Sequence, residues 1–215
     1  MTRDASVPGV PTRAQIAAAF DDIAEEFDAS RTHPWPETML FASLLPPASR
    51  VLDLGCGNGR NFAPFGDLGH TVVGLDVSRG LLLRAAAKVG SRRLVHGDAV
   101  RLPFRPSTVD AVHCVAAIHH LPSEDERRQT IEEVVRVLRP HGMVLLSAWA
   151  FEQPRFAGVG DADVDVPWRR TDGRVVPRFY HLFRADELKG LASSAGLAVD
   201  RAWREGDNHV VLASR

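Results

Sequence analysis

The alternation of short apolar segments with helical segments from residue 50 onward constrains the fold more than any other feature of this sequence. Seven apolar runs are suited to buried strands; in order they are RVLDL, TVVGLD, RLVHG, VDAVHCVA, MVLLSAW, LAVDRAW and HVVLAS. Strands that are buried on both faces give such continuous apolar runs, and helices between them indicate βαβ units. We therefore expect an α/β fold, with a mostly parallel seven-stranded sheet and helices on both of its faces.

Capping residues mark where the helices begin. Thr12 and Ser123 each precede a Gln or Glu by three positions, the spacing of a capping box, and Ser78 is a further N-cap candidate. After Thr12, apolar side chains recur at helical spacing, which predicts an amphipathic helix. The expected helices span residues 12–28, 79–89, 124–138 and about 184–195.

A glycine-rich turn follows the first predicted strand. The sequence reads VLDLGCGNGR, so Asp53 lies near the strand end and Gly55, Gly57 and Gly59 follow it. Bare backbone lets a ligand approach closely at the carboxyl end of a strand. The spacing is GxGxG rather than GxGxxG, and no GK[ST] follows, which disfavours both a dinucleotide site and a P-loop.

Acidic residues follow the next two predicted strands. Asp76 is placed to accept both hydroxyls of a ribose, and Asp98, followed by Ala99, is placed to accept from an adenine amino group. Strand, glycine loop and these two carboxylates, in this order, resemble the class I S-adenosylmethionine-dependent methyltransferases over roughly residues 48–149.

This resemblance implies a Rossmann-like fold and S-adenosyl-L-methionine as the cofactor. It also implies that Asp53 lies near the methionine amino group, directly or through water, and that the glycine loop passes the carboxypropyl chain. The expected cofactor-binding residues are Asp53, Gly55, Gly57, Gly59, Asp76, Asp98 and Ala99.

Length and apolar content fit one globular domain. With 215 residues and 45% hydrophobic side chains, the chain can bury a substantial core. We expect residues 1–11 to be disordered and 12–215 to form a single methyltransferase domain. Its expected parts are an N-terminal helical cap (12–47), the cofactor-binding core (48–149), a substrate insert after the fifth strand (150–183), and a C-terminal helix with two strands (184–215).

Segments mostly outside the core carry a narrower resemblance. They are FDDIAEEFDASRTHPWP, AAIHHLPSEDERRQTIEEVVRVLRPHG, WAFEQ, DVPW and RFYHLF. Over residues 19–212 they resemble the eukaryotic and archaeal tRNA wobble-uridine carboxymethyl methyltransferases, which esterify a carboxymethyl group on the anticodon base. The chain differs from that family in having Phe20 in place of Tyr, His209 in place of an aromatic residue, and a short insert.

The chemistry of such an esterification suggests roles for several residues. A carboxylate with a pKa near ~4 is already ionised at neutral pH, so it needs an anion clamp rather than a strong general base. Arg31 and Arg178 are our candidates for the clamp, and the alternative for each is a surface position or an internal salt bridge. His120, after the fourth strand, is expected to orient the acceptor, while His119 satisfies backbone groups.

Aromatic residues in the same segments are candidates to stack on an extruded pyrimidine. The expected substrate-binding residues are Trp35, Trp149, Trp168, Tyr180 and His181. Core packing is the alternative for each aromatic ring, because large rings bury well anywhere.

Two other functions fit many of the same residues. The first is a methyltransferase for a small carboxylate or amine, which the formal net charge of −1 mildly favours over a nucleic-acid substrate. The second is a non-catalytic S-adenosylmethionine-binding subunit, which would keep the glycine loop but lose the substrate residues.

The narrower resemblance implies two partners. These are the anticodon loop of a tRNA and a small zinc-ribbon activator subunit that covers an apolar sheet edge; any zinc would belong to that subunit. Cys56 and Cys114 are too few for a CxxC zinc site, so we expect no metal in the chain itself. No run approaches the ~20 apolar residues of a membrane span, and we expect a cytoplasmic protein without a membrane partner.

Overall fold

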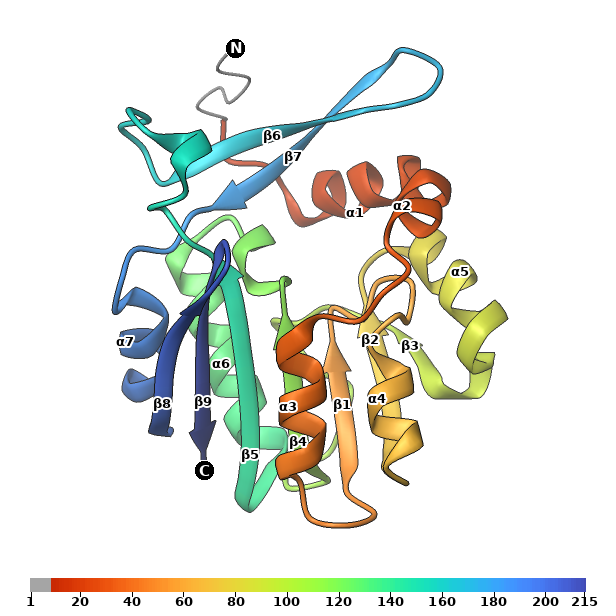
Figure 1. Cartoon of the computed structure of the whole chain (residues 1–215), viewed down its shortest axis with the longest axis vertical. Helices are drawn as coiled ribbons and strands as arrows, with labels where there is room; N and C mark the ends of the chain where they lie inside the picture. The colour runs from red at the N-terminus through yellow and green to blue at the C-terminus, as the bar shows by residue number, and fades with distance from the viewer. Residues whose placement is uncertain (1–8) are drawn as a thin grey trace.

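A seven-stranded sheet forms the centre of the molecule in the computed structural model, which describes residues 9–215 (Figure 1). The strand order is β3-β2-β1-β4-β5-β9-β8, and only β9 runs antiparallel to its neighbours. The strands are β1 (Arg50–Leu54), β2 (Thr71–Asp76), β3 (Leu94–His96), β4 (Val109–Val115), β5 (Leu138–Trp149), β8 (Ala198–Glu205) and β9 (Asn208–Ser214). All seven predicted strands are confirmed.

Helices cover both faces of the sheet, as the sequence predicts. On one face, α3 (Pro36–Leu44), α4 (Phe62–Asp67) and α5 (Arg79–Val89) share an apolar cluster with Val51 and Val72 of the sheet. On the other face, α6 (Glu124–Val137) and α7 (Glu187–Ser194) pack against Leu52 and Val112. Side chains alternate between the two faces of a strand, so Val51 and Leu52 face opposite layers.

The predicted helix starts are confirmed. Thr12 and Ser123 each form the two reciprocal hydrogen bonds of a capping box, and the Ser78 side chain accepts from the Leu81 backbone N–H. These contacts satisfy backbone donors that a helix start leaves free.

The N-terminal segment differs from the predicted single helix over 12–28. It forms α1 (Arg13–Asp22) and α2 (Ala24–Ser30), which are separated at Ile23. Both pack on α5, where a Cβ built on Gly80 would lie 2.9 Å from the Ala24 Cβ. The segment 12–47, expected as an N-terminal helical cap, also contains α3. This helix does not act as a cap: it buries Phe41 and Ala42 in the apolar cluster on the face of the sheet.

The insert after β5 contains an ordered hairpin. After the short 3-10 helix η3 (Pro154–Phe156), β6 (Asp163–Arg169) pairs antiparallel with β7 (Val175–His181), and the hairpin extends above the sheet towards α1 (Figure 1). From the sequence we expected residues 150–183 to form a substrate insert and predicted no strands in it, because the segment is rich in Gly, Pro and Asp. The Asp172-Gly173 turn, with Gly173 at φ +87°, is a hairpin signal that this composition obscures.

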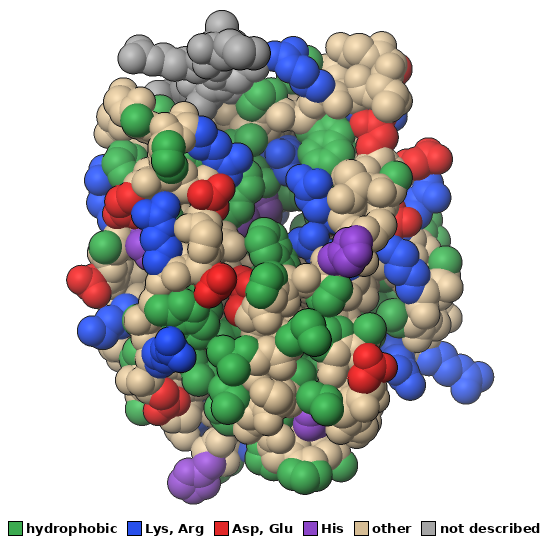
Figure 2. Space-filling model, in the orientation of Figure 1, with side chains coloured by type: hydrophobic (Ala, Val, Ile, Leu, Met, Phe, Trp, Pro, Cys, Tyr) green, Lys and Arg blue, Asp and Glu red, His purple; other side chains and the backbone are tan. Residues whose placement is uncertain are grey.

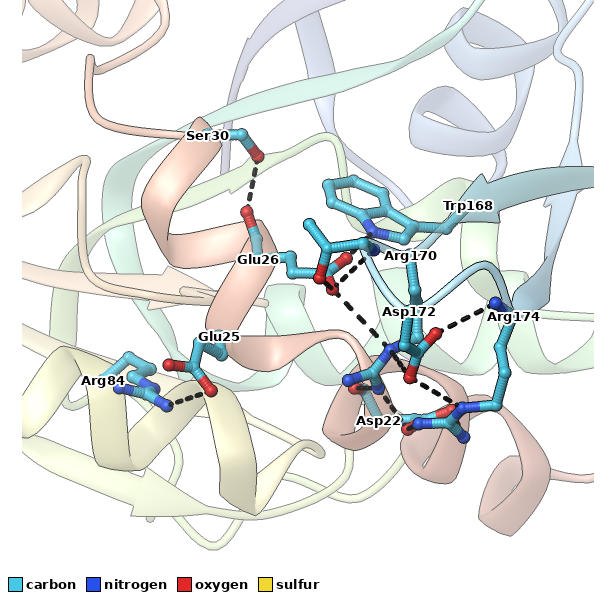
Figure 3. A network of polar contacts seen from close by, with 10 residues as sticks. Asp22, Glu25, Glu26, Ser30, Arg84, Trp168, Arg170, Asp172 and Arg174 are labelled. Atoms are coloured by element: carbon cyan, nitrogen blue, oxygen red, sulfur yellow. Dashed lines mark hydrogen bonds and ion pairs between the residues drawn. The ribbon is translucent and has the colours of Figure 1, made fainter.

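A polar network ties the hairpin to α1 and α2 (Figure 3). The Glu26 carboxylate accepts hydrogen bonds from Trp168 Nε1 at 2.9 Å, from the Thr171 backbone N–H at 3.0 Å and from the Thr171 hydroxyl at 2.9 Å. Arg170 and Arg174 form ion pairs with Asp22. The hydrogen bonds, led by that from Trp168, lower the pKa of Glu26. Segments almost 150 residues apart in the sequence are thereby joined.

Two expectations from the sequence concern the ends of the chain and membranes. The disorder predicted for residues 1–11 falls mostly on 1–8, which lie outside the described residues. None of the described helices combines the length and the apolar character that a bilayer span requires. A cytoplasmic location stays a prediction.

Candidate active site

A cavity of about 460 Å³ opens at the carboxyl ends of β1, β2 and β4, under α1, α2 and the hairpin. Figure 2 shows a hollow in this part of the surface, bordered mainly by Lys and Arg side chains. Of the predicted site residues, those that line the cavity are Arg31, Trp35, Gly55, Gly57, Asp76, Ala99, His120, Trp149, Trp168, Arg178 and Tyr180. Most of the predicted site residues thus line one cavity, although they come from distant segments of the sequence.

Glycine is required by geometry at two positions of the loop after β1. Gly55 has φ +74°, and a Cβ built on it would lie 2.4 Å from the Ala117 Cβ. Gly57 has φ +54°, and its backbone N–H donates to Asp76 Oδ2 at 2.7 Å. The loop therefore lies flat against the end of the sheet and exposes backbone to the cavity.

The Asp76 carboxylate lies at the end of β2, where it is buried and lines the cavity. Its Oδ1 accepts from the Ser78 backbone N–H at 2.8 Å. Burial raises the pKa of Asp76 to about 6, and the negative charge of Asp53 contributes to the rise. A buried carboxylate that lines the cavity and has lone pairs left can accept hydrogen bonds from both hydroxyls of a ribose. Such hydrogen bonds would favour the ionised form of the carboxylate.

Three predicted cofactor residues, Gly59, Asp98 and Asp53, do not line the cavity. Gly59 faces α5 instead, where a Cβ would meet Ala85 at 3.2 Å, so its glycine serves helix packing. Asp98 is ion-paired with Arg13 and accepts from the Val100 backbone N–H at 3.1 Å. Contact of Asp98 with an adenine stays a prediction, as does the placing of Asp53, which is buried at the end of β1 and does not line the cavity.

His119 and His120 lie in the 3-10 helix η2 (Ile118–His120) and form opposite hydrogen bonds. His119 Nδ1 accepts from the Trp149 backbone N–H at 3.0 Å, which is the structural role expected for it. His120 Nδ1 lies 3.0 Å from the Phe179 carbonyl oxygen and must donate, because a carbonyl only accepts. Burial lowers the pKa of His119 well below its ordinary value and that of His120 to about 3. Both rings are therefore neutral, and Nε2 of His120 is an acceptor.

The two predicted clamp arginines converge on one indole. The guanidinium carbons of Arg31 and Arg178 lie 5.6 Å and 5.0 Å from the centre of the Trp168 ring. Arg178 is buried, and its Nη1 donates to the Tyr180 hydroxyl at 2.8 Å, while its Nε has no hydrogen-bond partner among the described residues. Burial lowers the pKa of Arg178, and the nearby charge of Arg31 lowers it further. Within the described part of the chain, neither arginine forms an ion pair with a carboxylate.

Stacking of Trp149 and Tyr180 on a base stays a prediction, and the structure gives both rings packing partners of their own. These rings stack on each other with centres 4.1 Å apart, and the Arg155 guanidinium lies 3.9 Å from the Trp149 ring centre. Both faces of Trp149 are therefore covered, and Tyr180 is only 3% exposed. These rings build the cavity wall, and Trp35 and Trp168 remain candidates to contact a base.

A contact of His181 with the substrate also stays a prediction. Its Nδ1 lies 2.6 Å from Asp163 Oδ1 and its Nε2 lies 2.7 Å from Glu187 Oε1, and it does not line the cavity. It connects the start of the hairpin to α7. A similar tie holds His209, whose Nε2 lies 2.9 Å from Glu152 Oε2.

The cavity is also lined by four arginines that were not predicted as site residues: Arg13, Arg60, Arg155 and Arg169. Arg60 lies over the Trp35 ring, with its guanidinium carbon 5.0 Å from the ring centre, and burial lowers its pKa to about 10. Asp76 is the only acidic residue among the described residues that line the cavity. The cavity is thus strongly basic in a chain whose formal net charge is −1.

Comparison with known proteins agrees with this geometry. A family described as a methyltransferase domain matches residues 52–146. A tRNA (carboxymethyluridine(34)-5-O)-methyltransferase of Schizosaccharomyces pombe is 30% identical over 224 aligned residues, which cover 93% of this chain and 96% of that protein. An Arabidopsis thaliana protein of the same name is 39% identical over 64% of this chain, which spans about 33% of that longer protein.

Solved structures show the same fold at low sequence identity. An S-adenosylmethionine-dependent methyltransferase of Methanosarcina mazei has a TM-score of 0.71 and 21% identity, over 85% of this chain and 98% of that one. A Haloferax volcanii structure, described as a complex of a methyltransferase with the Trm112 methyltransferase activator, has a TM-score of 0.70 and 18% identity, over 93% and 96%. With its class I fold and S-adenosyl-L-methionine as cofactor, the chain therefore belongs to the family of the tRNA (carboxymethyluridine(34)-5-O)-methyltransferases.

Proposed function

We propose that the chain methylates the carboxylate of a carboxymethyl-modified uridine at the wobble position of a tRNA anticodon. The observation that carries this proposal is the convergence of Arg31 and Arg178 on Trp168, without carboxylate partners, in a cavity lined by six arginines and one acidic residue. A guanidinium that forms no ion pair within the described chain is available for an anionic substrate, and it pairs well with a carboxylate. The relatives' names agree with a carboxylate acceptor on tRNA.

The reaction needs positioning more than acid or base chemistry. S-adenosyl-L-methionine supplies an electrophilic methyl group on a sulfonium. A carboxylate oxygen forms a bond to that methyl carbon as the carbon–sulfur bond breaks, and no proton has to leave the acceptor. Proximity of this kind is worth up to ~7 to 11 kcal/mol in well-oriented systems.

The residues of the cavity can be assigned to that task. Arg178, held by the Tyr180 hydroxyl, and Arg31 hold the carboxylate oxygens, and the Trp168 ring, which both guanidinium groups approach, fixes the plane of the carboxymethyl uridine. The neutral Nε2 of His120 accepts a hydrogen bond from an N–H of the base. It would not donate to the carboxylate, because its proton is on Nδ1.

A small zinc-ribbon activator subunit is the second partner that we propose. β3 is a sheet edge with one free side, and on the adjacent α5 the side chain of Leu83 is 74% exposed. An open strand edge beside exposed apolar surface favours association with another chain. We expect the protein expressed alone to aggregate or to bind cofactor poorly, and co-expression with such a subunit to correct both; full affinity and monodispersity alone would argue against an obligate partner.

The substrate assignment is tested with a tritiated methyl donor and two tRNAs, one that carries the carboxymethyl group and one that lacks it. We expect label only in the first tRNA, and we expect mild alkali to release it, because a methyl ester hydrolyses. Label that enters both tRNAs equally, or that survives alkali, would show a different acceptor. A small carboxylate or amine that is methylated in place of either tRNA would indicate a metabolite methyltransferase.

A further inference from the structure

A histidine is buried in the middle of β4, next to the acidic residue that ends β1. His113 is fully buried in an otherwise apolar strand, VDAVHCV. Strand register places it directly opposite Asp53. Buried polar side chains need partners, so a histidine at this position requires a physical explanation.

Both ring nitrogens of His113 are engaged. Nδ1 lies 2.7 Å from Asp53 Oδ1, and Nε2 lies 2.9 Å from the hydroxyl oxygen of Thr38 in α3. The Phe41 ring stacks on the imidazole at 6.3 Å, and the Phe65 ring approaches it edge-on at 5.4 Å. The ring can neither turn nor exchange partners without disturbing this packing.

This arrangement leaves one oxygen of the carboxylate free. Asp53 Oδ2 is buried and has no hydrogen-bond partner among the described residues. The next two residues, Leu54 and Gly55, line the cavity. The negative charge of Asp53 raises the pKa of Asp76 and opposes the fall in the pKa of Arg60, and both of these residues line the cavity. The field of the carboxylate therefore acts in the cofactor site.

We infer that His113 is a positioning residue for the cofactor: it holds Asp53 Oδ1 so that Oδ2, although Asp53 does not line the cavity, is fixed as the acceptor, directly or through water, for the α-amino group at the methionine end of S-adenosyl-L-methionine. A buried, unpaired carboxylate oxygen favours a cationic donor, and besides its sulfonium the cofactor has one such group, the ammonium. Thr38 completes the chain, because its hydroxyl donates to Nε2 and keeps the His113 proton on Nδ1, where it faces Asp53.

Two substitutions at His113 separate this role from simple core packing. The side-chain amide of Asn occupies the position of Nδ1, and that of Gln reaches the position of Nε2. His113→Asn therefore keeps a donor to Asp53, while His113→Gln keeps only the contact with Thr38. Both introduce a polar amide into the same buried position, so each is the control for the other.

The experiment measures calorimetric binding of two ligands to the full chain. S-adenosylhomocysteine has the amino acid end, and 5′-methylthioadenosine has the same nucleoside and thioether without it. We expect H113Q to bind S-adenosylhomocysteine about tenfold more weakly than the wild type, the effect of losing one charge-assisted contact, with unchanged binding of methylthioadenosine. H113N should bind both ligands as the wild type does.

Three results would overturn the inference: equal weakening of both ligands in H113Q, no change for either ligand, or a loss in H113N as large as that in H113Q. Thermal unfolding of each ligand-free variant shows whether it folds. If H113Q does not fold, Thr38→Val tests the same chain of hydrogen bonds from its far end. It should weaken S-adenosylhomocysteine binding and leave methylthioadenosine binding unchanged, and equal effects on both ligands would again overturn the inference.

Discussion

The cavity has two parts, which we name by the ligand that we propose for each. The cofactor half and the substrate half are built in opposite ways. The cofactor half consists of short loops at the ends of neighbouring strands, in which backbone groups are held by carboxylates, as Gly57 is by Asp76. The substrate half consists of side chains from α2, η2 and the hairpin, which meet only in the folded chain. Asp76, which lines the cavity, belongs to the first half, and the arginines that contact Trp168 belong to the second.

Because of this difference, different kinds of substitution should impair the two halves. The cofactor half depends on local backbone conformation, so a single substitution can destroy it without loosening the rest of the molecule. The substrate half depends on long-range contacts such as that of Glu26 with Trp168, so its geometry can be weakened from outside the cavity. Variants should therefore separate cofactor affinity from turnover.

The largest expected effect is on the cofactor half. Asp76→Ala removes the acceptor for the Gly57 and Ser78 backbone N–H groups as well as the predicted ribose contact. We expect binding of S-adenosylhomocysteine to fall below the limit of calorimetric detection, while the protein stays folded by circular dichroism. Gly57→Val, which places a branched side chain at φ +54°, should have the same effect. Unchanged binding in both variants would contradict the placing of the cofactor.

The cofactor half could be predicted from the sequence because its signal is local. A strand, a glycine loop and a carboxylate at the end of the next strand need no knowledge of long-range contacts. Gly59 shows where this reasoning ends, because its spacing fits the motif while its backbone faces α5. Sequence spacing places a residue in a loop but does not say which side of the loop meets the ligand.

The substrate half could be predicted only in part. Arg31 and Arg178 were found through resemblance, and the structure brings them to one ring. The covered faces of Trp149 depend on Tyr180 and Arg155, which no local pattern relates. His113 was missed although its signal was present, since one histidine within an apolar strand opposite an acidic strand end calls for a partner.

The second effect concerns the clamp. Arg178→Ala should lower turnover on carboxymethyl tRNA about a hundredfold, as expected for a buried charge-assisted contact, and leave S-adenosylhomocysteine affinity unchanged. Arg178→Lys should recover only part, because the planar fork is lost. Arg92→Ala removes an exposed arginine outside the cavity and is the matched control. A parallel loss of cofactor affinity in Arg178→Ala would show that the two halves are not separable.

The third effect is a pH dependence confined to the cofactor half. The pKa of Asp76 is raised to about 6, and the ribose hydroxyls favour its ionised form. As pH falls below 6 the free protein takes up this proton, so cofactor affinity should decrease, by about tenfold at pH 5 relative to pH 7. Affinity measured by calorimetry in Asp76→Asn should lack this change. At saturating cofactor, turnover should vary little between about pH 6.5 and 8.5, because His119 and His120 are neutral there and the acceptor is already ionised.

The smallest effect tests the contact between the hairpin and α2. Glu26→Ala removes three hydrogen bonds that hold Trp168 and Thr171, so the Trp168 ring should no longer be fixed beside Arg31 and Arg178. We expect KM for tRNA to rise about threefold to tenfold, with unchanged cofactor affinity and a change in tryptophan fluorescence.

The neighbouring Glu25 provides the matched control. It is exposed and, among the described residues, forms an ion pair with Arg84 of α5 at 3.5 Å, on the opposite side of α2 (Figure 3). Glu25→Ala should therefore leave KM for tRNA and the fluorescence unchanged, although it removes the same charge from the same helix. Equal effects of the two variants on KM would mean that tRNA responds to the charge of α2 rather than to the position of Trp168. Glu26→Gln sharpens the distinction, because an amide oxygen still accepts from Trp168 Nε1 and should preserve most of the tRNA affinity if position is what matters.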